Sequence, residues 1–329
     1  MTDFSERLRQ KLPELGPADG QLLLAVSGGP DSVALVCAIC AIRDQLDFTV
    51  TAAHLNHRLR PEADDDADWV AALCSKLGVP LVSGREDVSA VAKTQGQSIE
   101  EAARQVRYEF LLKTALDRGC SRIAVAHTAD DQAETILHHI LRGTGISGLR
   151  GMPETRELEP GVLLIRPMLG LTRANVVRFL DDVGQDTRTD STNADPSFTR
   201  SRIRTLLLPL VQREFNPAVT DALLRLGEQA GDVSETMELL ASQALGGAII
   251  DANDSACRID CEKLSSLPRH LVRECFKQIW KQQGWPLQRM GFREWDRLAD
   301  IVDEGGASSL PHGVDARRRG KLLALQRTT

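Results

Sequence analysis

A chain of 329 residues exceeds the usual size of a single domain, so two domains are the first expectation. Hydrophobic residues make up 42% of the chain, which is ample for a buried core. No apolar run approaches the roughly 20 residues that span a bilayer, and the polar N-terminus lacks a secretory signal. A soluble, cytoplasmic protein without a membrane partner is therefore expected. Its net charge of −6 means that any nucleic acid would be held by local basic clusters.

The seven cysteines argue for reduced thiols, because an odd number without a secretory signal does not indicate a disulfide framework. Cys37 and Cys40 have the CxxC spacing of redox and metal sites, but they lie in the apolar run SVALVCAICAIRD with no second CxxC nearby. Packing in the core is therefore favoured over metal or redox chemistry, since a buried free cysteine behaves as a small hydrophobic residue.

Short apolar strands alternate with longer helices through the first half of the chain. Strands are expected at 22–26, 48–55, 79–84 and 122–127, and helices at about 31–45, 62–78, 98–119 and 129–143. The third helix opens with a capping box, Ser98 and Glu101, and ends at Gly119. This alternation predicts an α/β fold with a doubly wound, mainly parallel, Rossmann-like sheet.

The pattern changes after about residue 205. A long helical connector leads into helices at about 267–284 and 287–305, with a short strand at 257–264 and two more near the end of the chain. The sequence therefore predicts a catalytic domain over 1–215 and a smaller, mostly helical domain over 216–329.

The loop SGGPDS follows the first strand and begins a helix. It comprises Ser27, Gly28, Gly29, Pro30, Asp31 and Ser32. The two glycines allow backbone amide groups to line a concavity, and the helix directs its positive end at the same space, so the loop suits an anion. It lacks the lysine of the familiar nucleotide loop. An aspartate at Asp31 makes sense if Mg²⁺ bridges its carboxylate to phosphate oxygens.

Two further polar clusters follow other strands. HLNH, with His54 and Asn56, comes after the second strand, and HTADDQAE, with Asp130, Asp131 and Glu134, comes after the fourth. In open parallel sheets, ligands bind at the carboxyl ends of the strands, so the three clusters are expected to meet at one edge. Carboxylates beside a phosphate loop indicate Mg²⁺ and an amine-bearing substrate more than zinc.

SGGPDS resembles the SGGxDS pyrophosphate-binding loop of the N-type ATP pyrophosphatases, which cleave ATP between the α and β phosphates and adenylate a substrate. Within this PP-loop superfamily, the chain is similar to the tRNA(Ile)-lysidine synthetase family over most of residues 20–215. The matching stretches, in order, are HLNHRLRPEADDDADWV, SIEEAARQVRYEFL, HTADDQAETILHHILRGTGISGLRGM, IRPMLGLTRANVVRFL and DSTNADPSFTRSRIRTLLLP.

The resemblance implies a two-step ligation on the wobble cytidine of the isoleucine tRNA with a CAU anticodon. ATP would adenylate the base at C2 with release of pyrophosphate, and the amine of free L-lysine would then displace AMP to leave lysidine. The modified base would pair with A instead of G. Members of the family are thought of as dimers, which leaves a homodimer open, although no segment of the sequence indicates an interface.

The resemblance also implies residue roles. The catalytic residues are expected to be Asp31, Asp131, Arg107 and Glu134. Phosphates would bind at Ser27, Gly28, Gly29, Pro30 and Ser32, and Mg²⁺ at Asp31 and Asp131. His54 and Asn56 lie where adenine contacts are expected. Lysine would be held by Asp130, Glu134 and Arg107, with Arg107 on its carboxylate or on a phosphate. Arg200 and Arg204 would touch tRNA or AMP.

The chain departs from the family pattern in two places. Ser201 replaces the asparagine of the usual TRNRIR, which puts in doubt any role for an amide at that position. The C-terminal part resembles the first C-terminal domain of the family, and the second domain of longer members is not expected. Fewer elements would then contact tRNA, which makes Arg317, Arg318 and Arg319 attractive candidates.

Two other functions stay open. A sulfur-inserting tRNA thiolase of the same superfamily would generally need catalytic or cluster-binding cysteines, and the one CxxC lies in an apolar helix. A non-catalytic nucleotide sensor on the same sheet would need neither the second acidic cluster nor the arginine-rich stretch TRSRIR, and both are present.

Overall fold

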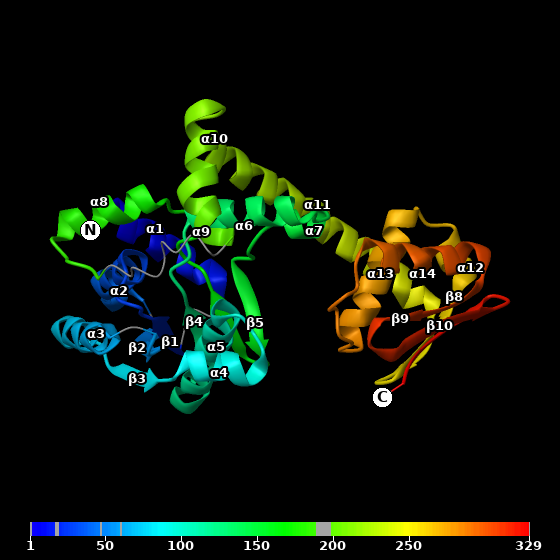
Figure 1. The fold of residues 1–329 in the computed structure, drawn as a ribbon, viewed down its shortest axis with the longest axis horizontal. Helices are drawn as coiled ribbons and strands as arrows, with labels where there is room; N and C mark the ends of the chain where they lie inside the picture. The colour runs from blue at the N-terminus through cyan, green and yellow to red at the C-terminus, as the bar shows by residue number, and fades with distance from the viewer. Residues whose placement is uncertain (1, 17–19, 47, 60, 189–198, 329) are drawn as a thin grey trace. The chain divides into compact units, whose positions relative to one another are not determined.

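The computed structural model describes residues 2–16, 20–46, 48–59, 61–188 and 199–328 (Figure 1). The chain divides into two compact units, Met1–Gly227 and Glu228–Thr329. The functional boundary expected after residue 215 falls inside the first unit and stays a prediction. Among the described residues, every helix is too short or too polar to span a membrane.

A six-stranded sheet in the order β3-β2-β1-β4-β6-β5 forms the centre of the first unit (Figure 1). Its strands are β1 (Gly20–Ala25), β2 (Phe48–Asn56), β3 (Leu81–Arg85), β4 (Cys120–Ala124), β5 (Thr155–Glu159) and β6 (Val162–Ile165). All neighbours pair in parallel except β5 and β6, which are antiparallel. The predicted doubly wound, mainly parallel sheet is confirmed.

The strand order reverses at β1. The chain moves outward from β1 through β2 and β3, and then returns to the other side of β1 with β4. Such a switch point opens a crevice at the carboxyl ends of the two central strands, where ligands of open α/β sheets bind. The loops at 26–29 and 125–128, and the first turns of the helices that follow them, lie at this place.

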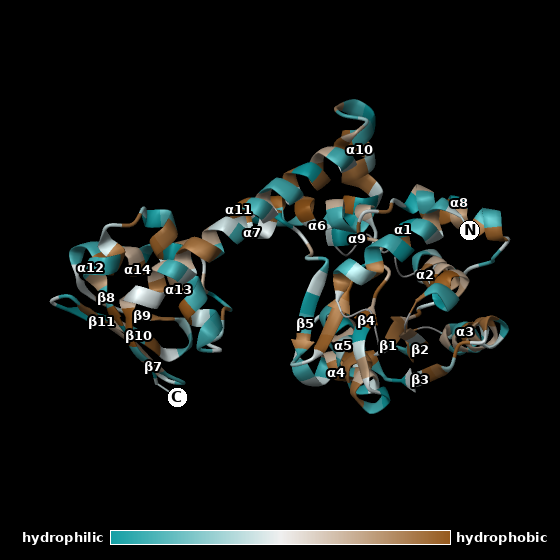
Figure 2. Ribbon diagram, turned by 180° about the vertical axis from the view of Figure 1, so that it is seen from behind, coloured by the Kyte–Doolittle hydropathy of each residue, from teal (hydrophilic) through white to brown (hydrophobic). Residues whose placement is uncertain are grey.

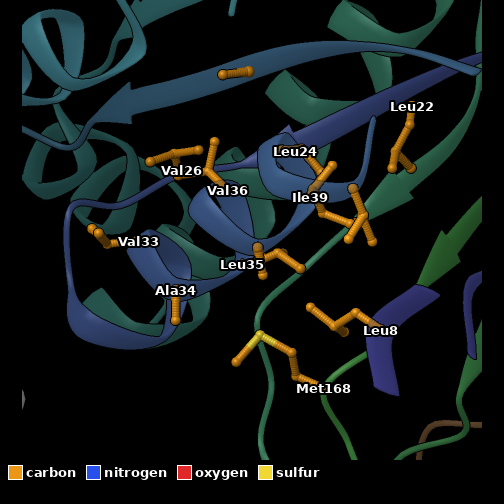
Figure 3. Packing of buried hydrophobic residues seen from close by; sticks show 14 of the residues in the cluster. Leu8, Leu22, Leu24, Val26, Val33, Ala34, Leu35, Val36, Ile39 and Met168 are labelled. Atoms are coloured by element: carbon orange, nitrogen blue, oxygen red, sulfur yellow. The ribbon is translucent and has the colours of Figure 1, made fainter. Parts of the chain in front are cut away.

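Both faces of the sheet are covered, so alternate residues of β1 pack into two different cores. Leu22 and Leu24 pack with α1 (Asp3–Lys11), α2 (Pro30–Ile42), α3 (Ala63–Leu77) and α8 (Arg173–Val183) (Figures 1 and 3). Leu23 enters a separate core with α5 (Ile99–Arg118), which packs beside α4 (Val88–Gln95). Figure 2 shows apolar colouring along the central strands. A strand buried on both faces has a continuous apolar run, as LLL does here.

Several expected elements agree with the structure in detail. Helix α5 opens with the Ser98–Glu101 capping box and ends at Gly119, whose φ of 68° is left-handed. The helix α1, the helix α4, the hairpin β5–β6 and the helix α8 were not expected. The strand β5 (TRELE) is largely exposed at the sheet edge, so it carries no apolar alternation that would reveal it.

The remaining helices of the first unit follow the fourth strand and the hairpin. They are α6 (Ala129–Arg142), α7 (Ile146–Leu149), α9 (Thr199–Arg202), the π-helical η4 (Ile203–Leu207), α10 (Leu208–Glu214) and α11 (Val219–Ala248), which crosses into the second unit. Short 3-10 turns lie at Leu12–Leu15 and Arg43–Gln45. Ala133 and Ile136 of α6 pack against Leu223 of α11 in a small core of their own.

The second unit combines helices with an antiparallel five-stranded sheet in the order β7-β8-β11-β10-β9. The strands are β7 (Ile249–Asn253), β8 (Ala256–Asp260), β9 (Gly306–Leu310), β10 (Val314–Arg319) and β11 (Leu322–Arg327), and the helices are α12 (Cys261–Ser265), α13 (Arg269–Gln282) and α14 (Phe292–Glu304). The sequence indicated three of these strands and the two longer helices. Trp280 anchors the core, with the rings of Trp285 and Trp295 edge-on against it.

Candidate active site

The loop after β1 is shaped by the hydroxyl group of Ser32. The amide groups of Ser27 and Gly28 donate to Ser32 Oγ at 3.1 and 3.2 Å, and Oγ donates to the Gly29 carbonyl at 3.0 Å. Gly28 has a φ of 91°, and an added Cβ would lie 3.3 Å from Val70, so both conformation and space favour glycine there. Ser32 therefore fixes the backbone of this loop at the N-terminal end of α2.

Asp31 lies in the first turn of α2 with 24% of its side chain exposed. One carboxylate oxygen is 3.7 Å from Arg173, and the other, Oδ1, is buried without a hydrogen-bond partner among the described residues. Burial raises the pKa of Asp31 to about 6. The positive charge of Arg173 acts to lower this pKa, and the negative charge of Asp131 acts to raise it. A carboxylate oxygen without a hydrogen-bond partner, beside a loop suited to phosphate, is a suitable ligand for a cation that binds together with the phosphate group.

Asp131 is the third residue of α6 and closes a capping box that the sequence analysis did not identify. Thr128 donates to Asp131 Oδ2 from its amide at 2.9 Å and from its hydroxyl at 3.0 Å. Burial raises the pKa of Asp131, but the Thr128 amide and the nearby Arg200 outweigh it, so the net pKa lies below the ordinary value. The carboxylate is therefore charged and fixed in direction.

Glu134 lies one turn further along α6, with 1% of the residue exposed. Arg204 donates to its two oxygens at 2.5 and 2.8 Å, and Arg200 reaches one of them at 3.3 Å. Arg204 also donates to Asp131 Oδ1 at 2.8 Å. Two arginines therefore neutralise the acidic pair that was expected to face Mg²⁺ and lysine. Breaking one partner of such a buried pair costs about 3–5 kcal/mol.

The two arginines enter the site from α9 and η4. A π-helical turn is rare and often occurs at functional sites. Ser201, between them, is 8% exposed, and its carbonyl accepts from the Thr205 hydroxyl at 2.8 Å. The remainder of the matching stretch, residues 189–198, lies outside the described residues.

Asp130 has a structural partner in another helix. It accepts a hydrogen bond of 2.7 Å from the backbone amide of Arg173, which ties the start of α6 to the start of α8. Arg173 was not singled out by sequence. The feature of the sequence that could have pointed to Arg173 is a positively charged residue at the start of a helix that follows a buried strand. Arg107 lies exposed on α5, and its expected role with lysine stays a prediction.

His54 and Asn56 were expected to follow the second strand, but β2 extends through Asn56, so both lie within its last three residues, and both are buried. His54 Nδ1 is 2.8 Å from the Val26 carbonyl, and burial lowers its pKa. The Asn56 amide donates to Ala63 and to Asp64, at 3.0 and 2.7 Å. Asn56 is thus engaged in holding the loop after β2, and its expected contact with adenine stays a prediction.

The basic triplet of the second unit has two faces, because side chains alternate along β10. Arg317 and Arg319 are exposed. Arg318 lies on the face of the buried Val314 and Ala316, and donates to the carbonyls of Gly320, at 2.7 Å, and Val302. Only the outer two arginines therefore present free surface charge for the expected tRNA contact.

Comparison with known proteins identifies the chain. The PP-loop domain family matches residues 1–211. The tRNA(Ile)-lysidine synthase of Dehalococcoides mccartyi is 36% identical over 84% of this chain and 60% of that protein, and the one of Chlorobaculum tepidum is 34% identical over 93% and 89%. The chain thus spans about three fifths of the first of these relatives.

Among solved structures, the U34-tRNA thiolase NcsA of Methanococcus maripaludis, determined with its [4Fe-4S] cluster, is similar with a TM-score of 0.57. The match covers 69% of this chain and 78% of that one at 15% identity, so it shows the fold alone. The fold, the loop geometry and these relatives agree with one another: the chain belongs to the tRNA(Ile)-lysidine synthase family, and its first unit carries the PP-loop domain of that family.

Proposed function

We propose that this protein is an ATP-dependent ligase that attaches L-lysine to C2 of the wobble cytidine in the CAU-anticodon isoleucine tRNA. The reaction would pass through an adenylated cytidine and release pyrophosphate and then AMP, so that the tRNA reads AUA. The observation that supports the proposal is that Asp31 of the SGGPDS loop lies within electrostatic reach of Asp131 and Arg204 at the switch point of the sheet, and that Arg204 also binds Glu134. The names of its relatives support the substrate.

Mg²⁺ is proposed to be held by Asp31 and Asp131. The orphaned Oδ1 of Asp31 fits this role, and Asp131 acts electrostatically on Asp31. Mg²⁺ commonly binds through one or two carboxylates together with substrate phosphates, which matches the two carboxylates proposed here. When bound, the ion would offset charge on the phosphates.

The arginine pairs suggest how lysine enters. Glu134 has no oxygen free of arginine in the present arrangement. We infer that the lysine ammonium takes the place of a guanidinium on Glu134, which releases Arg200 or Arg204 toward the nucleotide phosphate. Because one cation replaces another on Glu134, that buried carboxylate keeps a positively charged partner. This one rearrangement would place lysine at Glu134 and an arginine at AMP, as the sequence led us to expect.

The proposal is tested by incubating purified protein with the tRNA, ATP and lysine, and by determining the mass of the wobble nucleoside. We expect lysidine, with AMP and pyrophosphate formed in equal amounts. A transcript with U at the wobble position is the matched control and should remain unmodified. Consumption of ATP that is independent of lysine and tRNA, or release of ADP, would contradict the proposal. The site of action is proposed to be the cytoplasm, and a homodimer stays a prediction.

Thiolation is the alternative that the fold leaves open. It is not favoured by the thiols described here, because Cys37 and Cys40 lie on the core helix α2. Burial raises the pKa of Cys37 to about 11 and also raises that of Cys40, so neither is a ready thiolate.

A further inference from the structure

His127 follows β4 and directly precedes the Thr128 cap of α6, so it borders the acidic pair. Arg166, at the end of β6, donates from Nε to His127 Nδ1 at 3.2 Å. Arg166 is 2% exposed and is itself fixed, because its Nη1 donates to the Pro153 carbonyl at 2.6 Å and its backbone amide to Glu154. The guanidinium therefore presents a rigid N–H to one side of the imidazole.

This contact decides where the histidine carries its proton. A guanidinium has only donors and keeps its protons at any pH that the fold survives, so Nδ1 must supply a lone pair. The proton of the neutral imidazole then lies on Nε2. The charges around the ring agree: burial, with Arg166, Arg200 and Arg104 adding to it, lowers the pKa of His127 to about 4 despite the opposing Asp131. A second proton on Nδ1 would point at the guanidinium.

A histidine beside catalytic carboxylates would ordinarily be assigned as a general base. Here neither nitrogen can accept a proton, since the lone pair of Nδ1 is engaged and Nε2 is already protonated. What the ring can offer is one neutral N–H donor on the side away from Arg166. Among the described residues no partner for Nε2 is found, and the ring is only partly covered.

We propose that His127 is a fixed, neutral hydrogen-bond donor to an acceptor oxygen of the bound substrate, and that Arg166 is the positioning residue that sets its tautomer. The acceptor would be a phosphate oxygen of the nucleotide or O2 of the cytidine. This deepens the proposed function and rests on it for the identity of the substrate, whereas the tautomer is a property of the protein alone.

The tautomer is tested first, on the full chain without substrate. Protein labelled with ¹⁵N at histidine is examined at pH 7 by long-range ¹H–¹⁵N correlation, and the His127 signals are assigned by their loss in His127→Gln. We expect a proton on Nε2 and a bare Nδ1. His270→Gln is the matched control, because it makes the same substitution at an exposed histidine on α13 of the second unit. It should leave the spectrum of His127 unchanged. A proton on Nδ1, or on both nitrogens, overturns the proposal.

The role is tested by kcat/KM for lysidine formation in three variants. The amide nitrogen of His127→Gln can occupy the place of Nε2, whereas His127→Asn and His127→Ala cannot supply a donor there. We expect Gln to retain activity within about tenfold of the wild type, and Ala and Asn to lose about 10- to 100-fold more, the range of one donor to a charged acceptor. Equal losses in Gln and Ala would indicate a general base and overturn the proposal, as would full activity in Ala.

The acceptor is identified by binding of a non-hydrolysable ATP analogue without tRNA. Weaker binding to His127→Ala than to the wild type assigns a phosphate oxygen, and unchanged binding with impaired adenylation assigns the cytidine. If the wild type forms no lysidine at all, the proposed function fails while the spectroscopic result stands, so the two failures are distinguishable.

Discussion

Removal of the charge at Asp31 is expected to stabilise the ligand-free protein. Burial is the main cause that raises its pKa from the ordinary 3.8 to about 6. At 1.36 kcal/mol per pH unit, this difference corresponds to about 3 kcal/mol above pH 6. Because the folded state holds the proton more tightly than the unfolded chain, the group contributes stability below pH 3.8. That contribution is lost as the pH rises through about 6.

The assay compares Asp31→Asn with the wild type in urea, with EDTA present to remove divalent cations. Amide hydrogen exchange in β1 and β4 reports on opening of the first unit alone. We expect the variant to be more stable by about 2–3 kcal/mol at pH 8, with the gap closing toward pH 4. Adenylation should be lost, since a carboxylate proposed to hold Mg²⁺ is gone.

The matched control is Asp44→Asn, which changes the net charge equally at a side chain that is 99% exposed. Its effect is expected to stay within about 0.5 kcal/mol. If Asp31→Asn is no more stable than the wild type at pH 8, or if its advantage does not depend on pH, then the charged Asp31 carboxylate does not destabilise the folded protein. An unpaired buried charge lowers the free energy of unfolding, and ligand binding restores it; such a trade-off between stability and function is common at functional sites.

Three further variants test the second unit and the packing of the first. Arg317→Ala with Arg319→Ala should lower the salt slope of tRNA binding by about one for each arginine, and an unchanged slope would remove both from the interface. Arg318→Ala should instead destabilise the second unit by about 1–2 kcal/mol on thermal unfolding, because it loses bonds to backbone carbonyls. A loss of tRNA affinity without a loss of stability would reverse that assignment. Gly84→Ala would place a Cβ 2.5 Å from the Phe110 ring, so a loss of about 1–3 kcal/mol is expected, and an unchanged melting temperature would contradict this packing.

The features that sequence predicted well are those with local causes. The buried strand LLL, the Ser98–Glu101 capping box and the left-handed Gly119 each depend on a few neighbouring residues. The exposed edge strand β5 was missed for the same reason, since its pairing with β6 leaves no mark in its own composition.

The candidate site shows the same division. Its position followed from sequence, because loops after successive parallel strands must meet at one edge of the sheet. The partners of its charges did not. Glu134 looked like an open carboxylate, yet it is buried against Arg204, which is 70 positions away in the chain. Asp130 accepts a hydrogen bond from the backbone amide of Arg173, a contact that the sequence did not indicate, and its expected role with lysine stays a prediction.

Local features of the sequence were enough to predict the family, the type of sheet, the edge where the candidate site lies and the loop that suits phosphate. These features depend on short segments whose conformation is set by local sterics and by the pattern of apolar residues. Long-range packing, which appears only in the folded chain, shows which carboxylate is neutralised and which aspartate keeps an orphaned oxygen, and it carries the inference about which nitrogen of His127 holds the proton. The ionisation and hydrogen bonding of a buried group depend on whatever packing brings against it, and for Glu134 and His127 those groups come from distant parts of the chain.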